Sequence, residues 1–270
     1  MEDTCCVSRR WDDMDIDILF KIFQNLNIFE LTSGVGHVCR TWRMAACDPL
    51  LWKTLDMSLL KSNFIKIPLE PYVYVDGRSD KTFTRVLKIS LNLSRGNVST
   101  LIFHYNMYVS DDQLAYTADR CPRLKRLVMP AWNRIKKTGI CRAVRIWQDL
   151  ESLTMPSISN PVPRGGNFPK LQEILRDALI IILEGLKGLE VLNISHCLVV
   201  EVPPHPAPRR VLIELDKSIL ERASRLKTFL TCMSDSCIMC QRTRNDEGLI
   251  RWYKYEEDLW KVDEVSSLAV

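Results

Sequence analysis

Four segments of the 270-residue chain share one short pattern: an aliphatic residue, two variable residues, a leucine, one variable residue and an apolar residue. Three of them are residues 121–129 (CPRLKRLVM), 148–155 (QDLESLTM) and 187–194 (KGLEVLNI), and an earlier copy runs from Val98 to Phe103. Their central leucines are Leu101, Leu127, Leu153 and Leu192, which are 26, 26 and 39 residues apart. Apolar residues at helical spacing precede three of the segments, at 111–119, 139–147 and 178–186. The repetition predicts a stack of strand–helix turns.

This pattern and its period resemble the leucine-rich repeat. The resemblance implies an α/β solenoid, in which short strands form a curved parallel sheet backed by helices. The open surface of such a solenoid serves binding rather than chemistry. An ordinary α/β domain with coincidental leucines is the alternative. Leu87, Ile89 and Leu91 alternate as a still earlier strand would.

The 39-residue interval does not fit the period. Residues 169–174 (PKLQEI) resemble a further strand, which divides the interval into parts of 21 and 18 residues. The part at 156–168 contains three prolines and two glycines and cannot hold a helix. Arg176 also falls where the other copies have an apolar residue. We therefore hypothesise that this irregular segment, 156–180, lacks part of one or more repeats.

The first sixty residues predict a compact helical unit. Between Ile16 and Leu26 the apolar residues form one stripe, and Asp12, Asp13 and Asp15 stand at its amino end, where carboxylates cap free amides. A second apolar set begins at Ile28, and two glycines then interrupt the pattern. A third helix, with an apolar face from Val35 to Ala46, is stopped by Asp48-Pro49. A unit this small exposes apolar side chains unless the following domain or another protein covers them.

Residues 10–57 resemble an F-box. The resemblance rests on MDIDILFKIF at 14–23, on VCRTWR at 38–43 and on DPLLW at 48–52, which recur at the right distances. It implies a docking surface for the Skp-type adaptor of cullin-based (SCF) ubiquitin ligases. The adaptor-facing residues that it implies are Ile18, Leu19, Ile22, Phe23, Leu31, Val38, Cys39, Trp42, Pro49, Leu51 and Trp52. Several of these must also form the small core, and the sequence does not separate the two roles.

The chain departs from the family at one position. F-boxes usually open with Leu-Pro, whereas this chain has Asp13-Met14. Without the proline the backbone at the start of the first helix is less rigid. We expect a lower affinity for the adaptor.

The last quarter of the chain predicts an end cover for the solenoid. A proline-rich stretch at 203–208 indicates a short polyproline-like spacer. Beyond it, apolar residues from Leu212 to Leu230 step by three or four and predict a long amphipathic capping helix. The last 25 residues, with Trp252, Tyr253, Tyr255 and Trp260, are aromatic and acidic and are expected to pack on that helix. The predicted divisions are an F-box at 10–57, a connector at 58–80, repeats at 81–202 and a terminal region at 203–270.

No motif for catalysis stands out. Cys232, Cys237 and Cys240 are weak candidates for zinc ligands, because a closed site needs four ligands and no histidine lies near them in sequence. We expect reduced thiols, with no metal and no cofactor. A Gly-rich phosphate loop and the Gly-x-Ser-x-Gly and His-Glu-x-x-His motifs do not occur.

Charge and cysteine content limit the classes of partner and the cellular compartment that the sequence predicts. The formal charge of +4, from 37 basic and 33 acidic residues, is too small to indicate nucleic acid. Residues 120–148 nevertheless contain nine Arg or Lys and no acid. They indicate either a solvated face or a basic, target-binding face that includes Arg126, Arg134, Lys136 and Lys137. Ten cysteines without a secretory signal predict a cytoplasmic or nuclear protein, and no apolar run is long enough for a membrane span.

The combination resembles plant F-box/leucine-rich-repeat proteins, which implies a non-catalytic substrate receptor of an SCF ubiquitin ligase. Such a receptor binds the adaptor, and through it the cullin, with its F-box and binds a target protein with its repeats. The alternative is a repeat-containing binding scaffold outside the ubiquitin system, such as a nuclear protein with a basic partner-binding face. The identity of the target is not encoded in any motif.

Overall fold

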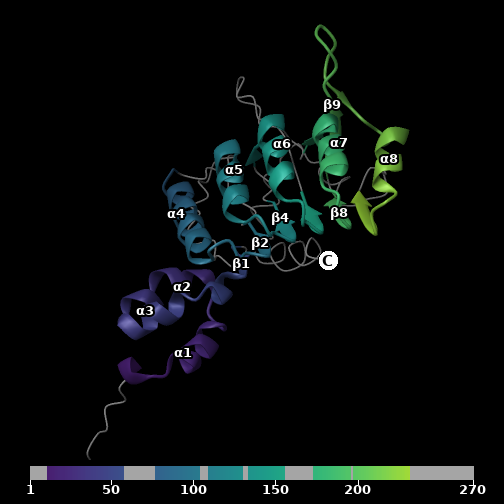
Figure 1. Cartoon of the computed structure of the whole chain (residues 1–270). Helices are drawn as coiled ribbons and strands as arrows, with labels where there is room; N and C mark the ends of the chain where they lie inside the picture. The colour runs from purple at the N-terminus through teal and green to yellow at the C-terminus, as the bar shows by residue number, and fades with distance from the viewer. Residues whose placement is uncertain are drawn as a thin grey trace, which may run out of the picture.

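The computed structural model describes residues 11–57, 77–103, 109–129, 133–155, 173–195 and 197–231. Figure 1 shows two parts, a helical unit at the amino end and a row of helices stacked against a sheet. The part of the chain that is described contains no helix long and apolar enough to span a bilayer.

The helical unit consists of short helices that are fixed by caps. Its elements are the 3-10 turn η1 (Trp11–Asp13), α1 (Ile16–Phe23), α2 (Ile28–Ser33), η2 (Val35–His37), α3 (Arg40–Ala46) and η3 (Pro49–Trp52). Asp15 caps α1, and Asn27 and Glu30 form a reciprocal capping box on α2. The predicted helix from Val35 is wrong at its start, because Cys39 is extended and caps α3 through its Sγ atom. Val38 is therefore exposed rather than on the inner face.

A six-stranded parallel sheet runs through the rest of the molecule. Its strands, in spatial order, are β1 (Thr54–Asp56), β2 (Thr100–Ile102), β4 (Arg126–Val128), β6 (Ser152–Thr154), β8 (Val191–Ile194) and β11 (Thr228–Thr231). Leu101, Leu127, Leu153 and Leu192 lie in register on neighbouring strands, as the repeat pattern predicts. The same row begins with Leu55 and ends with Phe229, so the sheet extends beyond the predicted repeats at both ends.

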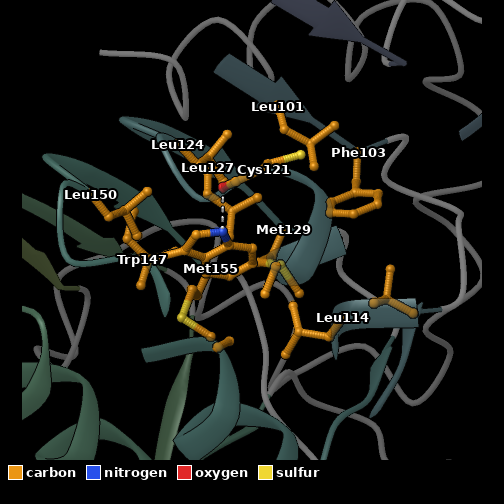
Figure 2. Packing of buried hydrophobic residues seen from close by; sticks show 14 of the residues in the cluster. Leu101, Phe103, Leu114, Cys121, Leu124, Leu127, Met129, Trp147, Leu150 and Met155 are labelled. Carbon is orange, nitrogen blue, oxygen red and sulfur yellow. Dashed lines mark hydrogen bonds between the residues drawn. The ribbon is translucent and has the colours of Figure 1, made fainter. Parts of the chain in front are cut away.

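In the main sheet, one helix precedes each strand from β2 onward, and these helices cover the sheet from one side (Figure 1). These helices are α4 (Gly77–Leu93), α5 (Asp111–Arg120), α6 (Lys137–Ile146), α7 (Arg176–Gly185) and α8 (Lys217–Ala223). The core lies between the two layers, and its repeated leucines are joined by larger side chains such as Phe103 and Trp147 (Figure 2). The indole Nε1 of Trp147 donates a hydrogen bond of 3.0 Å to the carbonyl of Cys121 in the preceding turn.

Two small sheets lie outside the main one. One pairs β3 (Val109–Ser110) with β5 (Asn133–Arg134), and the other orders β10 (Arg210–Val211), β9 (Leu198–Glu201) and β7 (Glu173–Leu175). The strand predicted at 169–174 corresponds in part to β7, but β7 pairs with β9 rather than entering the main sheet. Because β6 pairs directly with β8, the 39-residue interval contributes one turn, not two, to the main sheet.

Two further predictions are wrong. Leu87 and Leu91 are buried residues of the helix α4, not of a strand, because apolar residues four apart also lie on one helical face. Residues 212–230 do not form one long helix: α8 covers only Lys217–Ala223, and the chain then turns into β11. The described end of the solenoid is therefore another strand–helix turn rather than a capping helix.

The proline-rich stretch is also not a spacer between two parts. It joins β9 to the antiparallel strand β10 and so forms the loop of a hairpin, visible above α7 in Figure 1. The three cysteines at 232–240, the aromatic tail and most of the predicted connector and irregular segment lie outside the described residues.

Candidate docking surface of the helical unit

The helical unit has its own core, and part of the predicted adaptor-facing set forms it. Leu19 and Phe23 point inward from α1, and Phe23 contacts Trp42 edge to face with 5.4 Å between ring centroids. Leu31 of α2 and Trp52 of η3 are also buried, and the Trp52 Nε1 donates to the Ala46 carbonyl at 2.9 Å. Leu19, Phe23, Leu31 and Trp52 are therefore core residues of the unit, with exposed fractions of 0% to 7%.

Other members of the predicted set do face solvent. Ile18 and Ile22 lie one turn apart on α1, and Val38 lies between η2 and α3; their exposed fractions are 52%, 41% and 55%. Because these large aliphatic side chains are in contact with water, burying them against a partner would gain hydrophobic free energy. Cys39, Trp42, Pro49 and Leu51 are half-buried and lie partly within reach of a partner.

Four exposed apolar residues of the same unit are not in the predicted adaptor-facing set: Trp11, Ile16, Met44 and Leu50. Leu50 had a sequence signal, because it follows the Asp48-Pro49 stop and so lies beyond the end of the third predicted helix. In the structure Asp48 accepts a hydrogen bond from the Leu50 N–H at 2.9 Å. Ile16 begins α1, where the first turn extends beyond the core. For Trp11 and Met44 the sequence contains no such signal.

The start of α1 is held without the usual proline. Trp42 Nε1 donates a hydrogen bond of 2.9 Å to the Trp11 carbonyl, which fixes the η1 turn to α3. Asp15 then accepts from the Asp17 N–H at 2.8 Å and caps α1. These two contacts fix the backbone on both sides of Met14. They supply rigidity that the sequence argument had treated as lost.

Three of the nine residues in the basic run form ion pairs with acids of adjacent turns. Lys137 lies 3.4 Å from Asp177, and Arg142 lies 2.7 Å from Asp119. Lys125 contacts Glu151 at 2.7 Å, and this hydrogen bond and charge raise the lysine's pKa. The predicted target-binding residues do not share one element: Arg126 is on β4, Arg134 on β5, and Lys136 and Lys137 begin α6. The ion pairs favour the interpretation as a solvated face that joins neighbouring turns.

The described residues show no cluster of three or more potential metal ligands. Burial raises the pKa of the Cys121 thiol to about 12, so that this cysteine is an apolar core residue at neutral pH. Cys232, Cys237 and Cys240 lie outside the described residues, and the zinc hypothesis remains a prediction.

Comparison with known proteins identifies the chain. Residues 16–58, which include most of the helical unit, match the family model described as F-box-like. An F-box/LRR-repeat protein of Arabidopsis thaliana is 56% identical to this chain over 96% of both proteins. The chain belongs to the F-box/LRR-repeat family.

Other A. thaliana relatives are more distant. A putative F-box protein is 23% identical over 99% of this chain and 98% of its own length. The F-box protein SKIP1 is 27% identical over 63% of this chain and 56% of its own length. The matched F-box region and the in-register leucines agree with the two-part organisation of an F-box/LRR-repeat protein.

The similar F-box/LRR-repeat protein also bears on the irregular interval. Its alignment with this chain is 297 positions long, whereas this chain has only 270 residues. The alignment therefore contains positions that the relative has and this chain lacks. The hypothesis that repeat residues are missing at 156–180 stays a prediction.

Proposed function

We propose that this F-box/LRR-repeat protein is a non-catalytic substrate receptor of an SCF-type ubiquitin ligase, acting in the cytoplasm or nucleus. Its exposed apolar residues on α1, at the η2–α3 junction and on η3 bind a Skp-type adaptor. The adaptor joins it to a cullin, and the solenoid holds a target protein. The ligase then acts by proximity, because a bound target presents its lysines at a high effective concentration to a ubiquitin-loaded enzyme.

One observation carries the adaptor proposal. The helical unit fills its core with Leu19, Phe23 and Trp52 and yet leaves Ile18, Ile22 and Val38 exposed. The described part of the neighbouring solenoid leaves these residues exposed, although the unit is joined to it through β1 and β2. Exposed aliphatic residues on a rigid, capped helix are typical of a binding site for another protein.

The test is co-purification of the full chain with a Skp-type adaptor. We expect the wild type to recover the adaptor and Ile18→Asp/Ile22→Asp to lose at least about 100-fold in affinity, since two central contacts of an interface become charged. Both side chains are exposed, so stability should change by no more than about 0.5 kcal/mol per substitution. Trp52 is a poor probe, because its loss would damage the core.

Ile213→Asp is the matched control. Ile213 is an exposed isoleucine of the solenoid, remote in sequence from the F-box, and the same chemical change there should leave adaptor recovery unchanged. Equal recovery with wild type and with Ile18→Asp/Ile22→Asp would contradict the proposal. So would a wild-type chain that is folded and recovers no adaptor.

A further inference from the structure

A hollow of about 350 Å³ lies at the junction of the F-box and the solenoid. It is found where α4, the first helix of the solenoid, meets the F-box (Figure 1). Pro49 of η3 forms its F-box side. Residues 94–97, which follow α4, and residues 122–123, which follow α5, form its solenoid side. We call it the junction hollow.

Backbone hydrogen bonds hold the sides of the junction hollow together. The carbonyl of Lys53, directly after η3, accepts from the N–H groups of Ser99 and Thr100 at 2.9 and 3.2 Å. The carbonyl of Ser99 in turn accepts from the Lys125 N–H at 2.9 Å. These bonds join the end of η3 to the loop after α4, and that loop to the one after α5. The hollow is therefore preformed, and a partner does not have to order it.

The charge of the junction hollow is positive. Arg95 and Arg123 line it with exposed side chains, and no lining residue is an acid. Within the described ranges neither guanidinium forms an ion pair. Two exposed cations in one hollow, without a carboxylate between them, favour an anionic partner, and a guanidinium binds a carboxylate with two parallel hydrogen bonds.

The backbone does not explain why residue 95 is an arginine. Arg95 has a φ of 50°, in the left-handed region, and Gly96 follows with a φ of 80°. Glycine and asparagine adopt this conformation more readily than a long side chain does. A positive charge just after the end of α4 is favourable to the helix dipole. It is also placed to contact an anion in the hollow, and the two roles differ in what a substitution changes.

We propose that the junction hollow is a second contact site for the partner of the F-box and takes acidic side chains of a Skp-type adaptor. Pro49 in its wall directly precedes Leu50, which is 60% exposed and belongs to the proposed adaptor-binding surface. The apolar surface on η3 and the positive hollow are therefore continuous. An adaptor seated on η3 thus has Arg95 and Arg123 beside it. This inference rests on the function proposed above and adds an electrostatic contact to it.

The test is the affinity of the full chain for a purified Skp-type adaptor, measured by titration calorimetry at about 50 mM and about 500 mM salt. The variant is Arg95→Asn/Arg123→Gln, in which asparagine keeps the backbone conformation at position 95. We expect its affinity to be at least about fivefold weaker than that of the wild type at low salt. The difference should shrink at high salt, because screening weakens contacts between exposed charges.

Arg145→Gln/Arg209→Gln is the matched control. Both residues are exposed arginines of the solenoid that lie outside the lining of the hollow, and the pair removes the same net charge. The control should bind the adaptor like the wild type. Arg123→Glu, which leaves the backbone at position 95 untouched, should weaken binding more than Arg123→Gln does.

Equal affinity of the wild type and a folded Arg95→Asn/Arg123→Gln at low salt would overturn the proposal. Equal weakening by the control pair would also overturn it, since net charge alone would then be responsible. The unfolding midpoint of each variant, by circular dichroism, shows that it is folded. A wild type that binds adaptor, a loss in Ile18→Asp/Ile22→Asp and no loss in the arginine variant would remove this inference and keep the proposed function.

Discussion

Asp216 connects the last described turn of the solenoid to the one before it. Its carboxylate caps α8 by accepting from the Ile219 N–H at 3.0 Å, and it also contacts Ser218 and Arg176. Burial by itself would raise the pKa of this carboxyl, but the hydrogen bonds from Ser218, Arg176 and Ile219 outweigh it and lower the pKa to about 2. Arg176 is thus a partner of Asp216, which explains its place in a position that is apolar in the other repeats.

This lowered pKa predicts acid sensitivity. A carboxyl whose pKa is lower in the folded state contributes stability above its unfolded pKa of about 3.9, and this contribution is lost as the pH falls toward about 2. Urea unfolding at pH 6 and pH 2.5 should show a smaller loss of stability in Asp216→Asn than in the wild type. An equal loss in both proteins would contradict the assignment.

At the residue level the sequence locates the apolar stripe of α1, but it does not show which residues of the stripe are buried and which are exposed. Ile18 and Leu19 are adjacent, as are Ile22 and Phe23, and each pair fits one broad apolar stripe. Only the orientation of α1 against α3 decides that Leu19 and Phe23 are buried while Ile18 and Ile22 are exposed. That orientation depends on tertiary contacts such as the Phe23–Trp42 ring pair, which no local pattern encodes.

Among the elements, α6 and α7 approach closely because α7 ends in a glycine. A Cβ on Gly185 would overlap the Cγ1 methyl of Val144. Val144 is buried and β-branched, and such a side chain has one strongly preferred rotamer in a helix. The two helices therefore cannot accommodate the additional methyl without moving apart.

Gly185→Ala should lower the free energy of unfolding by about 1–3 kcal/mol, since overpacking forces a backbone shift. Adding Gly185→Ala to Val144→Ala should lower the free energy of unfolding by less than adding Gly185→Ala to the wild type. A double-mutant cycle by urea denaturation measures this difference. Gly36→Ala is the control, because a Cβ there meets nothing within 4 Å and no loss is expected. Additive effects at 144 and 185 would show that the contact is unimportant.

The elements that were predicted well are those with a periodic pattern and a clear boundary. The α5, α6 and α7 helices each precede a strand with the leucine pattern, and the strands lie in the predicted register. The α8–β11 turn was missed because Leu226 and Leu230 continue the three-or-four spacing of α8, whereas Leu226 and Phe229 fit the repeat pattern. Leu226 belongs to both patterns, and the parallel pairing of β11 with β8 decides between them.

Across the whole molecule the F-box and the solenoid share one sheet. Leu55, in β1 at the end of the F-box, pairs with Leu101 of β2 and is buried. The Met57 N–H also donates to the Ile102 carbonyl at 2.8 Å, and α4 packs on both α2 and α5. The F-box is therefore fixed to the first turn of the repeats rather than tethered by a loop.

This continuity predicts one cooperative unfolding transition for the F-box and the repeats. Leu55→Ala should destabilise the whole chain by about 2–5 kcal/mol, the usual cost of a buried leucine. Tryptophan fluorescence and far-ultraviolet circular dichroism should give the same midpoint in the wild type and the variant. A variant in which one signal shifts and the other does not would show that the two parts unfold independently.

Hydrogen exchange of the full chain with and without a Skp-type adaptor tests the central claim most directly. We predict slower exchange on adaptor binding in α1, at the η2–α3 junction and in η3, where Ile18, Ile22, Val38 and Leu50 are exposed, with the solenoid strands unchanged. Slower exchange confined to the solenoid, or no change in α1 at saturating adaptor, would contradict the account.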